Sequence, residues 1–153
     1  MRLEKGEYLW RMVNEHMTQA RHQEVMRFNM TTLLLTLAGV VIGFITYDKE
    51  LTCFDLVPAC LLFLLGLFGV LFSAKHYERF NFHIARVRMY RQELERNFIN
   101  VNWKKIREEA DVYHEARFPR LVRQRQNLLW LVLHGINALI GVVFIIAICI
   151  RNK

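Results

Sequence analysis

Three long apolar runs, almost free of charged residues, alternate with charge-rich stretches along the chain. The runs cover residues 30–47, 57–74 and 128–150, so that each is about 18 to 23 residues long. An α-helix of that length crosses a hydrocarbon core of about 30 Å. A buried helix of a soluble protein rarely stays apolar on every face over about five turns. The pattern therefore predicts three transmembrane helices.

The residues before the first run show the period of an amphipathic helix. Its mostly apolar stripe, at steps of four, four, three and four, consists of Leu9, Val13, Met17, Ala20 and Glu24. No Pro or Gly separates this stripe from the first run. We therefore expect one helix to continue from the N-terminal segment into the first span.

The charged stretch after the second run shows a heptad-like seam that only Arg91 interrupts. The members of this seam are Tyr77, Phe80, Ile84, Val87, Leu94 and Phe98. No helix breaker separates the seam from the second run. We therefore expect the second span to continue as a stalk helix outside the membrane.

A turn and a proline divide the rest of this charged stretch. Three asparagines between residues 97 and 103 indicate a turn, after which residues 103–117 resume a helical pattern. Pro119 disfavours helical geometry at Phe118 and suits the first turn of a following helix. We expect that helix to lead into the third run.

The chain is thus predicted to be all-α, an integral membrane protein with three transmembrane helices and a small cytoplasmic helical bundle. Its predicted parts are an amphipathic helix (1–29), a transmembrane hairpin (30–74, with spans 30–47 and 57–74 and a short external loop 48–56), a cytoplasmic helical stalk and hairpin (75–127), a third span (128–150) and an external tail (151–153). We expect the first span to be retained, because it follows 29 mostly polar residues and no cleavage site follows it.

The distribution of charge predicts the orientation. Of the 21 Lys and Arg residues, five lie in residues 1–29 and thirteen in residues 75–126, whereas the 48–56 loop has one Lys and three acidic residues. The positive-inside rule places both basic segments in the cytoplasm, with the N-terminus inside and the C-terminus outside. Because topology accounts for the net charge of +7, that charge does not indicate nucleic-acid binding.

The cysteines say little about the fold. Cys60 falls inside the second span, where a thiol behaves as a small apolar group. Cys53 and Cys149 lie at a matching external depth, which allows a disulfide, although free thiols are the expected state.

No catalytic, cofactor or metal site is expected from the sequence. The six histidines lack zinc-ligand spacing, and Ser73 is the only serine. Two stretches resemble the Arg-to-His motif of helical HEPN-type ribonucleases: Arg107 to His114 and Arg11 to His16. In that family the resemblance implies an Arg that steadies a phosphate and a His that acts as acid or base. In both stretches the residue after Arg is not the Asn, His or Asp that is typical of this family, so a structural role is favoured.

Within the spans, small and polar residues are the candidates for helix contacts. Gly39 and Gly43 form a GxxxG motif, and Gly66 and Gly69 place small residues on the second span. The polar pair on the third span consists of His134 and Asn137, for which we expect hydrogen bonds across helices rather than a pore lining.

A cluster of arginines precedes the third span. It consists of Arg117, Arg120, Arg123 and Arg125. Basic residues next to a span attract anionic lipid head groups. An anionic ligand between helices is the alternative, although no phosphate-binding loop supports it.

The hairpin 30–74 followed by the stalk 75–98 resembles the small multi-span membrane effectors of bacterial antiviral defence systems. The resemblance implies a non-enzymatic, homo-oligomeric protein that perturbs or permeates the inner membrane when its cytoplasmic part is triggered. The third span departs from a simple two-span effector.

The residues themselves also favour self-association, because the intramembrane polar pair and the two cytoplasmic seams need partners. The expected partners are the bilayer, anionic lipids, further copies of the chain and possible cytoplasmic proteins. Two alternatives stay open, a membrane anchor or accessory subunit for a cytoplasmic enzyme and a membrane-tethered HEPN-like ribonuclease.

Overall fold

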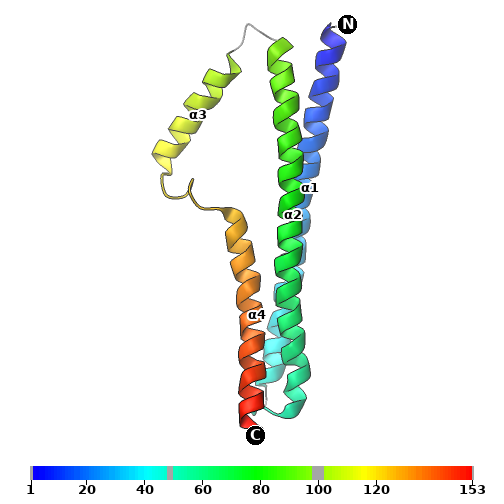
Figure 1. Cartoon of the computed structure of the whole chain (residues 1–153), viewed down its shortest axis with the longest axis vertical. Helices are drawn as coiled ribbons and strands as arrows, with labels where there is room; N and C mark the ends of the chain where they lie inside the picture. Colours follow the sequence, from blue (N-terminus) through cyan, green and yellow to red (C-terminus); the bar gives the residue numbers. More distant parts are fainter. Residues whose placement is uncertain (1, 48–49, 98–101, 153) are drawn as a thin grey trace. The chain divides into compact units, whose positions relative to one another are not determined.

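The computed structural model describes residues 2–47, 50–97 and 102–152, and these residues are all-α, as predicted. The elements in chain order are α1 (Arg2–Thr46), the 3-10 helix η1 (Cys53–Asp55), α2 (Leu56–Asn97), α3 (Trp103–Arg117) and α4 (Gln126–Arg151) (Figure 1). Three of these helices, α1, α2 and α4, are long and apolar enough to cross a membrane.

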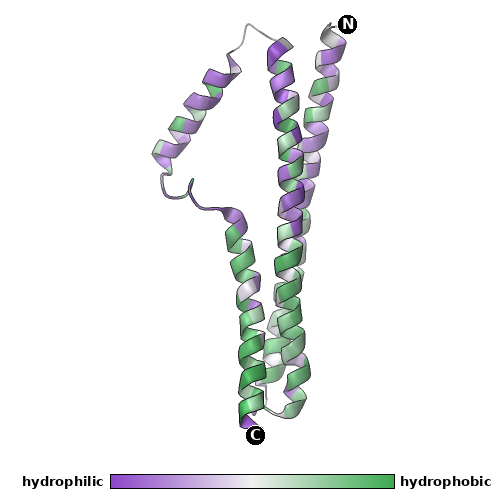
Figure 2. Cartoon of the chain, in the orientation of Figure 1, coloured by the Kyte–Doolittle hydropathy of each residue, from purple (hydrophilic) through white to green (hydrophobic). Residues whose placement is uncertain are grey.

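The two longest helices, α1 and α2, each combine an apolar half and a charged half (Figure 2). Their continuity agrees with the expectation that no breaker separates each apolar run from its charged extension. The buried residues of α1 follow one another at steps of three, four or seven, which is the heptad period of paired helices. They are Gly6, Leu9, Val13, His16, Ala20, Arg27, Thr31, Leu34, Ala38 and Ile45.

This seam differs in part from the predicted stripe. It passes through His16 and Arg27, whereas Met17 is half-buried and Glu24 is exposed. The predicted stripe followed apolar residues at helical spacing. The buried seam instead takes a step of three from Val13 to His16 and a step of four to Ala20. Two polar residues are therefore buried at positions that hydrophobicity alone did not indicate.

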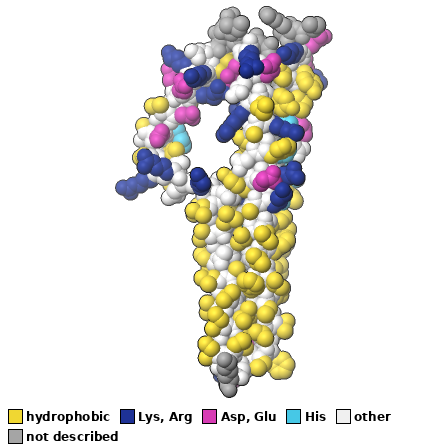
Figure 3. Space-filling model, viewed as in Figure 1, with side chains coloured by type: hydrophobic (Ala, Val, Ile, Leu, Met, Phe, Trp, Pro, Cys, Tyr) yellow, Lys and Arg dark blue, Asp and Glu magenta, His cyan; other side chains and the backbone are white. Residues whose placement is uncertain are grey.

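The chain divides into two compact units, and each contains part of α1 and part of α2. We call residues 24–77 and 127–153 the apolar unit, and residues 1–23 and 78–126 the charged unit. Hydrophobic side chains cover the visible face of the apolar unit, whereas Lys, Arg, Asp and Glu gather on the charged unit (Figure 3).

In the apolar unit, α1 and α4 run parallel and α2 runs antiparallel to both. Thr31 contacts His134 and Ile45 packs with Ile148, so the α1 and α4 numbers rise together. Ala59 of α2 completes the cluster with Ile45 and Ile148. Three successive apolar helices that alternate in direction are the arrangement that the three-span prediction requires.

A short connection joins α1 to α2 in this unit. The Asp55 carboxylate accepts hydrogen bonds from the Thr52 backbone N–H, at 2.7 Å, and from the Thr52 hydroxyl, at 2.9 Å. These bonds satisfy groups at the start of the helical segment. Pro58 falls in the first turn of α2, where its missing N–H costs nothing. Cys53, Cys60 and Cys149 are exposed free thiols.

In the charged unit, the first part of α1 lies antiparallel to the last part of α2. Lys5 pairs with Glu93 at 2.8 Å, and His16 contacts His83. Leu9, Val13 and Ala20 of α1 are buried, as is one residue of the predicted α2 seam, Val87.

The other seam residues that the structure describes, Tyr77, Phe80, Ile84 and Leu94, are half-buried. Phe98 lies outside the described residues, as does most of the predicted asparagine turn.

The third helix of the charged unit, α3, covers the predicted range, but the following helix begins later than expected. Asn102 caps α3 by accepting a hydrogen bond from the Lys105 N–H at 3.0 Å. Turns follow Phe118, and α4 starts only at Gln126. Arg120, Arg123 and Arg125 therefore precede the helix instead of lying on it. This segment is exposed, so no packing offsets the cost of starting a helix, and like charges three residues apart oppose one.

Candidate functional site

A cluster of buried polar side chains lies inside the apolar unit. Its members are Arg27 and Thr31 on α1, Ser73 on α2 and His134 on α4, and each is at most 6% exposed. Arg27 and Thr31 are one helical turn apart, so they share a face of α1. Burying a polar group costs free energy unless the group forms hydrogen bonds, so each member of this cluster needs a partner.

His134 is the centre of this cluster. Its Nε2 lies 3.0 Å from the Thr31 hydroxyl, and the tautomer of the ring decides which group donates. The other ring nitrogen, Nδ1, and the Ser73 hydroxyl are buried without a hydrogen-bond partner among the described residues. The contact between Thr31 and His134 joins α1 to α4 and satisfies one side of the ring.

Gly69 on α2 makes the space for this ring. A Cβ atom built on Gly69 would overlap the His134 ring atoms Nδ1, Cγ and Cε1. Ser73 follows Gly69 by one turn, on the same face of α2. The two helices therefore enclose the imidazole because one of them lacks a side chain at this position.

Arg27 is a buried cation at the start of the first apolar run. Its Nη1 donates to the Asn127 side-chain oxygen at 3.3 Å, and its guanidinium lies 5.9 Å from the Tyr77 ring and 5.5 Å from the Trp130 ring. No carboxylate forms an ion pair with it among residues 2–47, 50–97 and 102–152. Two aromatic faces and one amide are thus its described contacts, and the nearby Glu24 carboxylate acts on it through its charge without an ion pair.

The glycines of the apolar unit divide into two groups. A Cβ atom on Gly66 would overlap the Ala138 backbone, and one on Gly141 would overlap the Phe63 backbone. By contrast, Gly39 and Gly43 have nothing within 4 Å of such an atom. The close approach inside the chain therefore joins α2 to α4, and the GxxxG motif of α1 faces open space.

The open side of α1 carries more small residues than the GxxxG motif alone. We call it the open α1 face, and it consists of Thr32, Thr36, Gly39, Gly43 and Thr46, all exposed. Their steps of four, three, four and three match one helix face. The Thr hydroxyls bond to carbonyls of their own helix, at 2.9 to 3.0 Å, which leaves them compatible with an apolar environment. The threonines were not predicted to belong to this face, although they continue the spacing of Gly39 and Gly43.

The charged unit contains a histidine pair. The Nδ1 atoms of His16 and His83 are 3.1 Å apart, so one ring donates a hydrogen bond to the other. The Tyr90 ring stacks on His16, at 5.6 Å between centroids and 7° between planes. Burial lowers the pKa of His83, and the nearby His16, Arg86 and Arg79 lower it further, against the opposing effect of Glu15. The sequence did not indicate that His16 would meet His83 and Tyr90.

The remaining predicted residues lie apart from these clusters. Asn137 is half-buried, and its side chain has no hydrogen-bond partner among the described residues. The four arginines from Arg117 to Arg125 are exposed, and Arg117 contacts Tyr113 and Phe118. Within the described ranges, no three metal-ligating side chains come together.

The two stretches that resemble the ribonuclease motif have other contacts. Arg107 forms two hydrogen bonds with Glu95, at 2.7 and 3.2 Å, and His114 packs against Phe118. Arg11 pairs with Glu7, and His16 contacts His83.

The fold defines an all-α chain with three helices that are apolar enough to span a membrane. No protein-family model, curated protein or solved structure matches the chain. Only the features of the two units therefore bear on its function.

Proposed function

We propose that this chain is a membrane protein that crosses a bacterial inner membrane three times and acts as a homo-oligomer, by perturbing or permeating the bilayer and not by catalysing a reaction. The N-terminus and the charged unit lie in the cytoplasm and the C-terminus outside. The observation that carries this proposal is the open α1 face, whose small residues no other part of the described chain covers.

Small residues favour association in a bilayer because they let two backbones approach closely. Lipid is as apolar as Leu, so helices in a membrane associate through van der Waals packing and not through exclusion from water. Inside the chain, Gly66 and Gly141 already serve this purpose between α2 and α4. The open α1 face offers the same chemistry to a second copy.

The polar residues within the spans favour self-association less strongly than the sequence predicted. His134 finds Thr31 within its own chain, so it does not require a second copy. Asn137 remains without a described partner and keeps that demand. The open α1 face and Asn137 therefore support self-association, whereas His134 does not.

Permeation would require a pathway with little charge. Residues 30–47, 57–74 and 128–150 contain no Lys, Arg, Asp or Glu, so the wall of any pore is mostly apolar. Such a wall controls conduction by wetting and dewetting. In this proposal, the charged unit receives the signal that changes the packing of the copies, as in a triggered defence effector.

The test combines assembly and leakage in liposomes. We expect the Gly39→Leu/Gly43→Leu double variant to lose oligomers in single-molecule photobleaching and to lose dye release, because two large side chains block close approach. Gly135→Leu is the matched control, since Gly135 also faces open space, on α4.

Unchanged oligomers in the double variant would refute the role of the open α1 face. Oligomers without any leakage or depolarisation from the wild type would refute permeation and leave assembly intact.

A membrane anchor for a cytoplasmic partner is a second candidate, because one observation favours it. No residue of α3 is buried, although it carries Trp103, Ile106, Val112 and Tyr113. An exposed helix with large apolar side chains is typical of a docking segment. Copurification of a stoichiometric soluble protein that Val112→Asp abolishes would support it, and a chain purified alone from its native membrane would contradict it.

A further inference from the structure

We propose that the charged unit binds a small planar aromatic molecule that carries one anionic group, a carboxylate or a phosphate. This inference goes beyond the proposed function, because it assigns a ligand to a cavity that assembly in the membrane does not need. The cavity has a volume of about 490 Å³, within the usual range for small-molecule sites. Its lining comes from three helices: Gly6, Trp10, Arg91, Leu94, Glu95, Trp103, Ile106 and Arg107.

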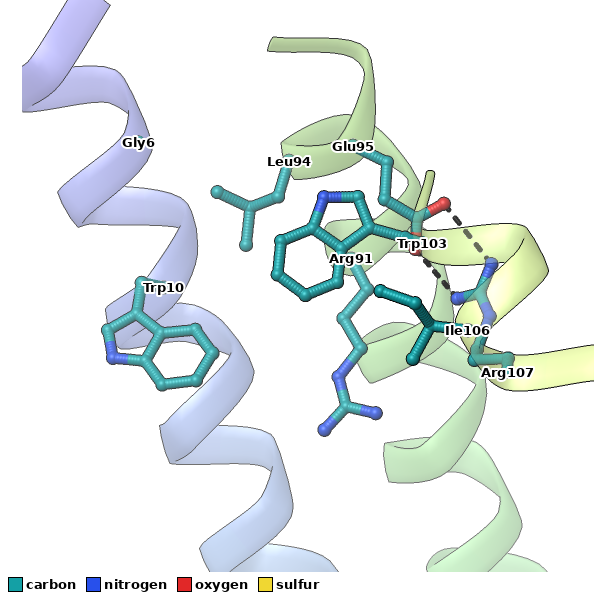
Figure 4. A pocket seen from close by; sticks show the side chains of 8 residues that line it. All are labelled: Gly6, Trp10, Arg91, Leu94, Glu95, Trp103, Ile106 and Arg107. Carbon is teal, nitrogen blue, oxygen red and sulfur yellow. Dashed lines mark hydrogen bonds and ion pairs between the residues drawn. The ribbon is translucent and has the colours of Figure 1, made fainter. Parts of the chain in front are cut away.

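The cavity walls favour an aromatic ligand body. Trp10 extends from α1, Trp103 and Ile106 from α3, and Leu94 from α2 (Figure 4). The two Trp side chains are about half exposed, at 54% and 44%. Large indole rings left in water gain from any flat apolar surface that covers them, and aromatic rings also pair with one another through their quadrupoles. An aromatic ring between walls that each carry an indole meets both conditions.

The charges around the cavity favour an anion. Arg107 is already committed to Glu95 through two hydrogen bonds, so these two charges cancel locally. Arg91 has no ion pair with any carboxylate in the described part of the chain, and Figure 4 shows its guanidinium extended away from Glu95. The lining therefore keeps one positive charge, on a group whose planar fork matches a carboxylate or phosphate.

The position of Arg91 adds an independent reason. Arg91 interrupts the apolar seam of α2 between Val87 and Leu94, where a heptad pattern alone would place an apolar residue. The apolar packing of α1 against α2 does not require a charge at this position. The Arg91 side chain instead supplies the charge of the cavity, beside the apolar surfaces of Trp10 and Leu94.

A ligand in this cavity would join α3 to the α1 and α2 part of the charged unit. Without it, the described polar contact that holds α3 to α2 is the Arg107–Glu95 pair, and an exposed ion pair stabilises little. Binding would therefore order α3 through contacts to the aromatic body, and it gives the charged unit a way to sense a small molecule.

The test is a binding titration on the full chain in lipid nanodiscs, by Trp fluorescence and calorimetry. Trp130→Phe serves as the parent, because it leaves Trp10 and Trp103, both in the cavity lining, as the emitting residues. The probes are naphthalene-2-carboxylate, adenosine monophosphate, the neutral naphthalene-2-carboxamide and laurate. The first two distinguish a carboxylate from a phosphate as the anionic group.

We expect saturable binding of at least one aromatic anion, weakened about tenfold or more by Arg91→Gln, since a charge-assisted hydrogen bond is lost. Binding of the neutral amide should be weaker in the parent and unaffected by Arg91→Gln. Trp103→Ala should weaken binding of all aromatic probes, with calorimetry as the readout and circular dichroism to check folding. Arg88→Gln, an exposed charge on the same helix outside the lining, is the matched control.

Three results would overturn the proposal. They are absence of saturable binding by both aromatic anions, equal affinity of the parent and Arg91→Gln for them, and preferential binding of laurate, which would make the site one for an acyl chain. None of these results depends on whether the chain forms oligomers or permeates a membrane.

Discussion

In the apolar unit α4 meets α2 backbone to backbone, whereas in the charged unit α3 meets α2 through the ends of two long side chains. Gly66 and Gly141 bring α2 and α4 so close that a single added carbon would overlap the facing backbone. The described polar contact between α3 and α2 is the pair of Arg107 and Glu95. The same long helix, α2, therefore holds its two partners by opposite means.

The difference shows how each unit suits its surroundings. Close packing yields many dispersion contacts and works without water, so it suits helices that are apolar on every face. An exposed ion pair contributes at most about 1 kcal/mol in water, and the apolar side chains of α3 remain exposed. The apolar unit is thus held by close packing, whereas the described polar contact of α3 with α2 is one exposed ion pair.

The two units also treat their histidines differently. His134 of the apolar unit is 1% exposed and contacts a hydroxyl that carries no charge, while His83 of the charged unit faces a second histidine and two arginines. Protonation therefore has a specific electrostatic cost in the charged unit.

The change Gly66→Ala should destabilise the apolar unit most. The added methyl group meets the Ala138 backbone, which cannot move without shifting α4, and we expect a loss of about 2–3 kcal/mol in the free energy of unfolding. Thermal unfolding in detergent, followed by circular dichroism, measures it. Gly39→Ala is the matched control and should leave stability unchanged or slightly higher, because nothing lies within 4 Å and Ala favours a helix. Equal effects of the two changes would contradict the backbone contact.

The change Thr31→Val should have an intermediate effect. It preserves the shape of the side chain but removes the hydroxyl, so Nε2 of the buried His134 ring loses its partner and, like Nδ1, is left without one. We expect a loss of about 1–2 kcal/mol in the same unfolding measurement. The neighbouring Thr32→Val removes a hydroxyl that is exposed and bonded to the Phe28 carbonyl, so it should change stability by less than about 0.5 kcal/mol. A neutral Thr31→Val would mean that the contact with His134 adds nothing.

The smallest expected effect is a dependence of the charged unit on pH. The pKa of His83 is lowered in the folded chain. Below the ordinary histidine value of about 6.5, the unfolded chain therefore binds more protons than the folded chain does. The stability contributed by neutral His83 is complete above that pH and declines as the pH falls toward the lower folded pKa. The groups that face His83 are His16 and Glu15 from α1 and Arg79 and Arg86 from α2.

Thermal unfolding of the full chain at pH 7.5 and 5.5 measures this effect. We expect the midpoint to fall with pH in the wild type and to fall less in His83→Gln. His22→Gln removes an exposed histidine of α1 and should keep the wild-type response. An identical response in all three proteins would show that His83 does not contribute to the pH dependence in this range.

Much of the fold could be predicted because hydrophobicity is a local property. The three apolar runs, the continuity of α1 and α2 and the extent of α3 all follow from residue types and from where breakers occur. The start of α4 could not be predicted in this way. Pro119 permits a helix, but a helix also needs packing, and residues 118–125 remain exposed.

The candidate sites were predictable only in part, because they depend on contacts between distant residues. The sequence singled out Gly66, Gly69 and His134, but it did not say that the first two would face α4 or that the third would meet Thr31. His16 and Arg27 were missed, since their heptad positions matter only once a facing helix is known. The sequence showed that Arg91 interrupts the apolar seam, but only the structure showed that it lines a cavity.

The sequence alone determined that this protein is helical and that three of its segments are apolar enough to cross a membrane, because length, hydrophobicity and charge act residue by residue. Only the tertiary structure decided which small residues are used inside the chain and which remain open on α1. It also decided that His16 meets His83 and that Arg91 lies in a cavity with two indoles. The physical reason is that close approach, shared hydrogen bonds and cavities are properties of pairs of surfaces, and no single stretch of sequence contains both members of the pair.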